Sequence, residues 1–199
     1  MAMKSSLSAR IVRAIMKVTV CLGASVAAFS GCGTDPVPQA VIDSLPAETG
    51  TPSATHRPGQ PCLQCHSTYG EALPELVIGG TVYKLDPMGA LKGAGGIRVI
   101  VYDSTGDSRV ACTNAAGNFY IEKDNWEGIT FPLKSFVGET SGGGASRRMQ
   151  SIIGREGSCA NCHKLPAADR PPPGAGHDTP GVIIVEDGEE SPMLCPGGL

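Results

Sequence analysis

The chain carries the pentapeptide Cys-x-x-Cys-His twice, at residues 62–66 and 159–163. This spacing is the attachment pattern of c-type haem, in which two thiols bond to the vinyl groups and the adjacent His ligates the iron. With 8 Cys and 4 His in the chain, a random arrangement would give roughly 0.006 such matches. We therefore expect two covalent haems. The expected attachment residues are Cys62, Cys65, Cys159 and Cys162, and the expected proximal ligands are His66 and His163.

Three other uses of a Cys-x-x-Cys pair are open to this chain. The two pairs could share one structural zinc as a four-thiolate site, which would leave the adjacent His residues without a role. Each pair could instead close as a disulfide in an oxidising compartment. Thioredoxin-type redox catalysis needs the motif between a hydrophobic strand and a helix, and neither copy follows such a strand. The sequence therefore argues against that last use.

Two further His residues are candidates for the distal iron ligands. His56 precedes the first motif by six residues, and His177 follows His163 by fourteen. Both lie in polar segments, where a lone His is otherwise simply solvated. Thioether ligands are the alternative and would raise the reduction potential. Their candidates are Met88, Met149 and Met193, although Met149 could equally serve core packing. A five-coordinate iron, open to peroxide chemistry, is the third alternative.

Residues 1–31 have the pattern of a signal peptide. Four basic residues precede a largely apolar run over residues 18–29, which is too short to span a membrane. These basic residues are Lys4, Arg10, Arg13 and Lys17. The chain is therefore expected to be exported.

The run ends in Phe29-Ser30-Gly31-Cys32, which resembles the bacterial lipobox. The resemblance implies that Cys32 becomes the diacylated N-terminus and anchors the protein to a membrane. Phe29 departs from the usual Leu, and ordinary signal cleavage, with Cys32 left as a spare thiol, is the alternative. Gly33 follows Cys32 where an Asp would imply inner-membrane retention. The resemblance thus implies a lipoprotein of the bacterial cell envelope, at the outer membrane, with its periplasmic or surface orientation open.

The charge of the mature chain bears on its partners. Removal of residues 1–31 takes away four basic and no acidic residues, and the formal charge falls from −3 to −7. An acidic surface excludes nucleic acid as a partner and favours basic redox proteins. Low aromatic content and many Gly and Pro residues predict a modest core, to which haem would add apolar volume. The sequence leaves the oligomeric state open.

The elements that must position the motifs are mainly β. We expect a Pro-rich extended tether at residues 32–58 and a first haem-binding segment at residues 59–74, with one or two helical turns at most. Residues 75–153 alternate apolar and polar side chains between turn residues, which predicts a small Greek-key-type β-sandwich. Residues 154–199 form the second haem-binding segment and the C-terminal tail. The expected strands are residues 76–83, 97–102, 108–113, 118–121, 133–137, 147–152 and 181–185.

Part of this region resembles the carboxypeptidase regulatory-like, transthyretin-like sandwich family. The matching residues are Gly80-Thr81-Val82-Tyr83, residues 93–99, Asp103-Ser104-Thr105-Gly106 and residues 113–119. The resemblance lies in strand and turn chemistry, so it implies a fold and carries no catalytic residue. Such domains commonly serve as spacers or as adhesive and scaffolding modules.

Cys112 and Cys195 remain once the motif cysteines, Cys32 and the discarded Cys21 are set aside. In an exported protein, two leftover thiols most simply form a disulfide, here between the sandwich and the tail. The alternative is that Cys112 is a small buried apolar residue within its strand.

These patterns predict a membrane-anchored dihaem c-type cytochrome that transfers electrons and transforms no substrate. A dihaem peroxidase is disfavoured because that family's two-domain body is much longer than this chain. The alternative is a surface scaffold or adhesion lipoprotein whose motifs bind zinc or form disulfides. The sequence leaves open how far apart the two motifs lie.

Overall fold

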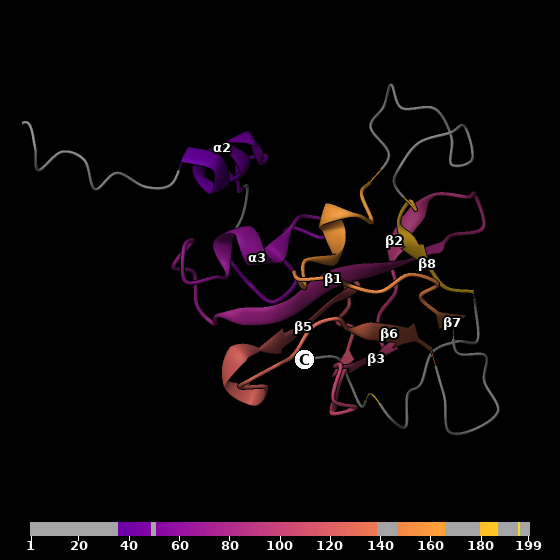
Figure 1. Cartoon of the computed structure of the whole chain (residues 1–199). Coiled ribbons are helices and arrows are strands. Elements are labelled where there is room, and N and C mark those ends of the chain that lie inside the picture. Colours follow the sequence, from indigo (N-terminus) through magenta and orange to yellow (C-terminus); the bar gives the residue numbers. More distant parts are fainter. Residues whose placement is uncertain (1–35, 49–50, 139–146, 166–179, 187–194, 196–199) are drawn as a thin grey trace, which may run out of the picture. The chain divides into compact units, whose positions relative to one another are not determined.

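The computed structural model describes residues 36–48, 51–138, 147–165, 180–186 and 195. The chain divides into two units, residues 1–43 and 44–199. Within the described ranges the protein is mainly β, with two short helices (Figure 1). The helices are α2 (Pro36–Ser44) and α3 (Cys62–Cys65), and the 3-10 turns are η2 (Lys123–Asn125) and η3 (Cys159–Asn161). The strands are β1 (Leu76–Leu85), β2 (Leu91–Gly93), β3 (Arg98–Tyr102), β4 (Ser108–Cys112), β5 (Asn118–Glu122), β6 (Lys134–Val137), β7 (Arg147–Arg148) and β8 (Ile183–Ile184).

The strands form two four-stranded sheets. The first has the order β2-β1-β5, with β8 parallel to β1, and the second has the order β4-β3-β6-β7. All pairings other than that of β8 are antiparallel. Strand β1 is the longest, and it contacts β2, β5, β8 and both motif segments. It is therefore the element around which the motifs are organised.

The buried faces of the two sheets share one hydrophobic core. The first sheet contributes Ile78 and Val82, and the second contributes Val99 and Val101, all nearly inaccessible to solvent. Alternation along each strand places these side chains on the inner face. Each fully buried side chain of this size stabilises the fold by about 1.5–3 kcal/mol. The other core residues are Ala94, Ile97, Ala111, Phe119, Ile121, Trp126, Leu133, Val137 and Val185.

The expected strands are present, with three differences. The strand expected at residues 181–185 is only two residues long, β8. Strand β7 covers only two of the six predicted residues, because the chain bends after it and only Ile153 returns to pair with Leu133. Strand β2 was not predicted. It is three residues long and pairs with the end of β1 through Leu91 opposite Leu85. So short a segment shows no measurable alternation in sequence.

Part of the segment expected as an extended tether, residues 32–58, is helical. Residues 36–44 form helix α2, in which Pro36 and Pro38 occupy the first turn. Proline is tolerated there because the first N–H groups of a helix have no intrahelical partner. The amide of Gln39 donates to Asp43 one turn later, at 2.7 Å. The proline content predicted an extended segment, although Pro36 and Pro38 stand at the start of a helix.

The later part of the expected tether is bonded to β5 and to the loop that precedes it. The side chain of Asn114 donates to the carbonyl of Ala54 at 2.6 Å, and that of Asn118 donates to the carbonyl of His56 at 2.8 Å. Both Asn residues are buried, and a buried amide needs such partners. The segment carrying His56 is therefore fixed to the strands.

A disulfide joins Cys112 at the end of β4 to Cys195, with an S–S distance of 2.01 Å. Cys195 is buried. The bond holds this point of the C-terminal tail against the second sheet.

Among the residues that the structure describes, no helix is long and apolar enough to cross a membrane. The expected signal peptide and the lipidation residue Cys32 lie outside the described residues.

Candidate haem attachment sites

The two motifs adopt similar local turns. The first motif forms helix α3, and the backbone N–H of His66 donates to the carbonyl of Cys62 at 2.9 Å. In the second motif, which begins as turn η3, the N–H of His163 donates to the carbonyl of Cys159 at 2.8 Å. Residues three and four positions apart share a face of such a turn. Each motif therefore presents its two thiols and its imidazole together.

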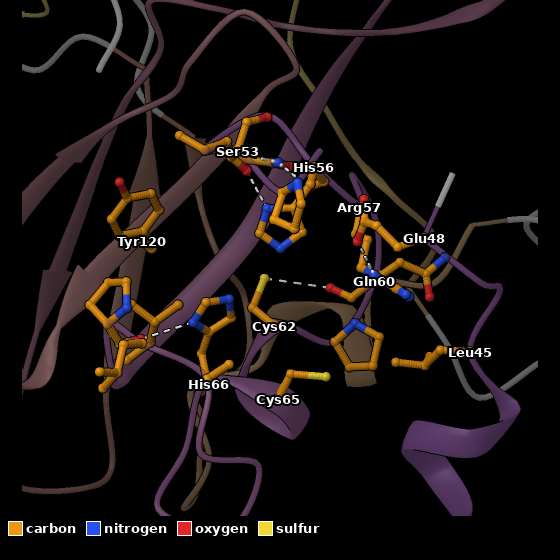
Figure 2. Close-up of a pocket in the computed structure, with 18 of the residues that line it drawn as sticks. Leu45, Glu48, Ser53, His56, Arg57, Gln60, Cys62, Cys65, His66 and Tyr120 are labelled. Atoms are coloured by element: carbon orange, nitrogen blue, oxygen red, sulfur yellow. Dashed lines mark hydrogen bonds and ion pairs between the residues drawn. The ribbon is translucent and has the colours of Figure 1, made fainter. Parts of the chain in front are cut away.

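Each motif lines its own cavity. The first cavity, of about 490 Å³, is lined by Cys62, Cys65, His56 and His66 (Figure 2). The second, of about 660 Å³, is lined by the second motif. Both volumes fall in the range of small-molecule and cofactor pockets, about 300–1,000 Å³. The apolar lining includes Leu45, Leu73, Leu76 and Phe119 in the first cavity, and Val137, Ile152, Ile153, Ile183 and Val185 in the second.

The imidazoles of His66 and His163 are each held by a hydrogen bond from Nδ1. Nδ1 of His66 donates to the carbonyl of Pro74 at 2.9 Å, and Nδ1 of His163 donates to the carbonyl of Gly181 at 2.8 Å. A carbonyl can only accept, so the proton lies on Nδ1 and the lone pair lies on Nε2. Metal-binding His residues are usually held in this way. Both side chains are therefore prepared to ligate a metal through Nε2.

His56 lies across the first cavity from His66. The two ring centroids are 5.8 Å apart, with a 38° angle between the ring planes (Figure 2). Nδ1 of His56 also donates to a backbone carbonyl, that of Ser53. Metal–imidazole bonds are about 2 Å long, so two imidazoles on one iron need ring centres roughly 6 Å apart. The spacing of His56 and His66 fits that requirement.

The distal side of the second site is described only in part. His177 and Met193 lie outside the described residues. Met149 lines the second cavity, together with His163. Met88 is 88% exposed and lines neither cavity, so the structure removes it from the set of candidate ligands.

The first cysteine of each motif is partly buried. Burial raises the pKa of Cys62, and it raises that of Cys159 to about 12, with the nearby Cys62 as a second cause. A buried thiol is a poor thiolate donor, whereas an uncharged thioether sulfur is suited to the same position. All four motif cysteines are free of disulfides. Within the described ranges, no group of three or more His, Cys, Asp or Glu side chains is placed to hold a metal ion, so these four thiols do not converge on one zinc.

Two adjacent glycines in β1, Gly79 and Gly80, allow both motifs to pack closely against the strand. A Cβ atom on Gly79 would lie 2.9 Å from Cβ of Cys62, and one on Gly80 would lie 2.7 Å from Cβ of Cys159. Real Cβ atoms essentially never approach so closely, so neither position accepts a larger residue without a shift. The sequence analysis assigned both glycines to a strand and missed this role. The signal was available, because Gly inside a strand often marks a close approach.

The donor set, the prepared imidazoles and the apolar cavities fit a covalently attached haem at each motif. A comparison of the chain with protein-family models, curated proteins and solved structures finds no match.

Proposed function

We propose that this protein is a lipid-anchored dihaem c-type cytochrome that carries electrons in a bacterial envelope. One observation supports it above the others: each Cys-x-x-Cys-His motif lines a separate apolar cavity, with the Nε2 lone pair of its His left for a metal. A bound haem would supply a one-electron couple between ferric and ferrous iron. The polypeptide would set ligation, burial and spacing.

At the first site, Cys62 and Cys65 would hold the haem, and His66 and His56 would ligate its iron. The carbonyls of Pro74 and Ser53 orient the two imidazoles. Fixed ring orientations keep both ligands in place during a change of oxidation state, so little reorganisation is needed. This property suits electron transfer rather than substrate binding, which requires an open position on the iron.

At the second site, Cys159 and Cys162 would hold the haem, with His163 as the proximal ligand. We propose His177 as the distal ligand. Met149 is its rival, because its side chain belongs to the same cavity. A thioether at this position would raise the potential of the second site above that of the first.

We further propose that the two sheets form a small β-sandwich of the transthyretin-like kind, which acts as a rigid support for both sites. Lipidation at Cys32 would anchor it to the outer membrane. The mature formal charge of −7 favours basic redox partners, whose approach an acidic surface would accelerate.

The deciding experiment is the denatured intact mass of the mature protein, produced with and without the c-type maturation machinery. We expect a gain of two haem masses only with the machinery. The variants Cys62→Ala/Cys65→Ala and Cys159→Ala/Cys162→Ala should each retain one haem, and the disulfide variant Cys112→Ala/Cys195→Ala should retain two. A mature protein without added haem would overturn the proposal and leave the scaffold lipoprotein.

A further inference from the structure

The two attachment sites lie on either side of one thin wall. Gly79 and Gly80 are neighbours in β1, so their Cβ positions point to opposite faces of the strand. Sγ of Cys62 lies 3.1 Å from the Cβ position of Gly79, and Sγ of Cys159 lies 3.0 Å from that of Gly80. The first cysteine of each motif therefore packs against the same dipeptide from the opposite face.

This arrangement limits the separation of the two sulfur atoms. The Cβ positions of neighbouring residues are at most about 7 Å apart. With the two contact distances added, the sulfur atoms of Cys62 and Cys159 lie within about 13 Å of each other. The two attachment points are thus close in space, although nearly the whole β-rich region separates them in sequence.

Phe119 completes the wall. It is paired with Gly80 in the antiparallel register of β1 and β5, and its Cζ atom lies 3.0 Å from the Cβ position of that glycine. Phe119 is buried, and it lines both cavities. The cavities are therefore separated by the aromatic ring of Phe119 and by two glycines. None of these three residues carries a charged or polar side chain.

We propose that the two sites form one interacting redox pair, with Gly79, Gly80 and Phe119 as the wall through which they interact. This inference rests on the proposed function. An electron added to one site places a negative charge close to the other across a low-dielectric wall, where Coulomb interactions are strong. Reduction of one site should therefore make reduction of the other more difficult.

The test uses the haem-loaded full chain and a reductive titration with dithionite, which supplies one electron to each site. We expect the lower of the two midpoints to lie below the value measured for the same site in the double-Cys variant that retains only that site. In the fully oxidised protein, dipolar interaction should speed the electron spin relaxation of both centres. On half reduction, the microwave power that half-saturates the remaining ferric signal should fall several-fold, and this measurement requires no variant.

The wall itself is tested by Gly80→Ala, with Val110→Ala as the control because Val110 is exposed in β4 and lines neither cavity. We expect Gly80→Ala to move Cys159 away and to reduce the interaction, and the control to retain it. Two attached haems with independent midpoints and unchanged relaxation would overturn this inference alone. A protein without attached haem would overturn both this inference and the proposed function.

Discussion

The side-chain amide of Asn118 donates a 2.8 Å hydrogen bond to the backbone carbonyl of His56. The same amide donates to the carbonyl of Ala54 at 3.3 Å, and its oxygen accepts from the hydroxyl of Thr81 at 2.9 Å. Asn118 lies in β5 and Thr81 in β1, so two strands hold the segment that carries His56. The sheet thereby determines where this imidazole stands relative to His66.

Asn118→Leu should release this segment without removing a ligand. Loss of a buried hydrogen-bonding side chain costs about 1–3 kcal/mol. We expect haem to stay attached but a fraction of the first site to become high-spin and to bind carbon monoxide. Asn118→Asp is the matched variant, because it keeps an acceptor for Thr81 but cannot donate to the carbonyls of Ala54 and His56. If both variants keep the parent absorption spectrum, Asn118 does not position His56.

Substitution of the proposed distal ligands should affect one proposed haem site at a time. His56→Ala should convert about half of the haem to high-spin, because the second site keeps its own ligands. At the second site, His177→Ala and Met149→Leu distinguish the two candidates, and we expect the change with His177→Ala. Absorption and electron paramagnetic resonance spectra provide the readout. A fully low-spin His56→Ala protein would contradict the assignment of His56.

Asp103 should contribute an acid-sensitive part of the stability. A hydrogen bond from the hydroxyl of Thr105, with further donors from Thr105 and Thr130, lowers the pKa of this carboxyl from 3.8 to about 2. A group with a lowered folded-state pKa stabilises the fold above its unfolded pKa, and that stabilisation is lost as the pH falls. The stability advantage of the parent over Asp103→Asn should therefore be full above pH 3.8 and should disappear towards pH 2.

Urea unfolding followed by circular dichroism at several pH values between 2 and 6 would measure this advantage. Asp124→Asn is a suitable control, since Asp124 is exposed in η2. Parallel pH curves for the parent and Asp103→Asn would show that the Asp103 hydrogen bonds do not contribute in this way.

The disulfide should support the fold independently of the haem sites. It joins residues 83 positions apart, and removal of a native disulfide from a small exported domain typically costs 2–5 kcal/mol. We expect Cys112→Ala/Cys195→Ala to lower the free energy of unfolding by about that amount and to leave the haem content unchanged. Urea titration and denatured mass on the same preparation test both statements. A variant as stable as the parent would show that the bond does not contribute.

The strands and the local form of the motifs were predictable because they depend on short-range patterns. The run of β-branched residues Val99-Ile100-Val101 indicated β3, and the turn residues around Gly106 and Gly117 marked the strand ends. The sequence suggested His56 as a candidate ligand, but its distance from His66 depends on the bonds from Asn118. Contacts between residues far apart in the sequence could not be predicted. The contacts of Gly80 with Cys159, and of Asn118 with Ala54, depend on tertiary register, which no local pattern encodes.

The docking of residues 157–159 beside β1 bears on when the proposed haem could be attached to Cys159. Gly79 forms a parallel bridge with Ser158, and the N–H of Gly79 donates to the carbonyl of Gly157 at 3.1 Å. The first motif meets β1 within a few residues along the chain, whereas the second packs against a strand that lies far earlier in the sequence. Once docked, the Cys159 thiol is buried and its pKa is about 12, so it is a poor nucleophile. In the proposed cytochrome, a haem would therefore be bonded to Cys159 before this segment docks on β1.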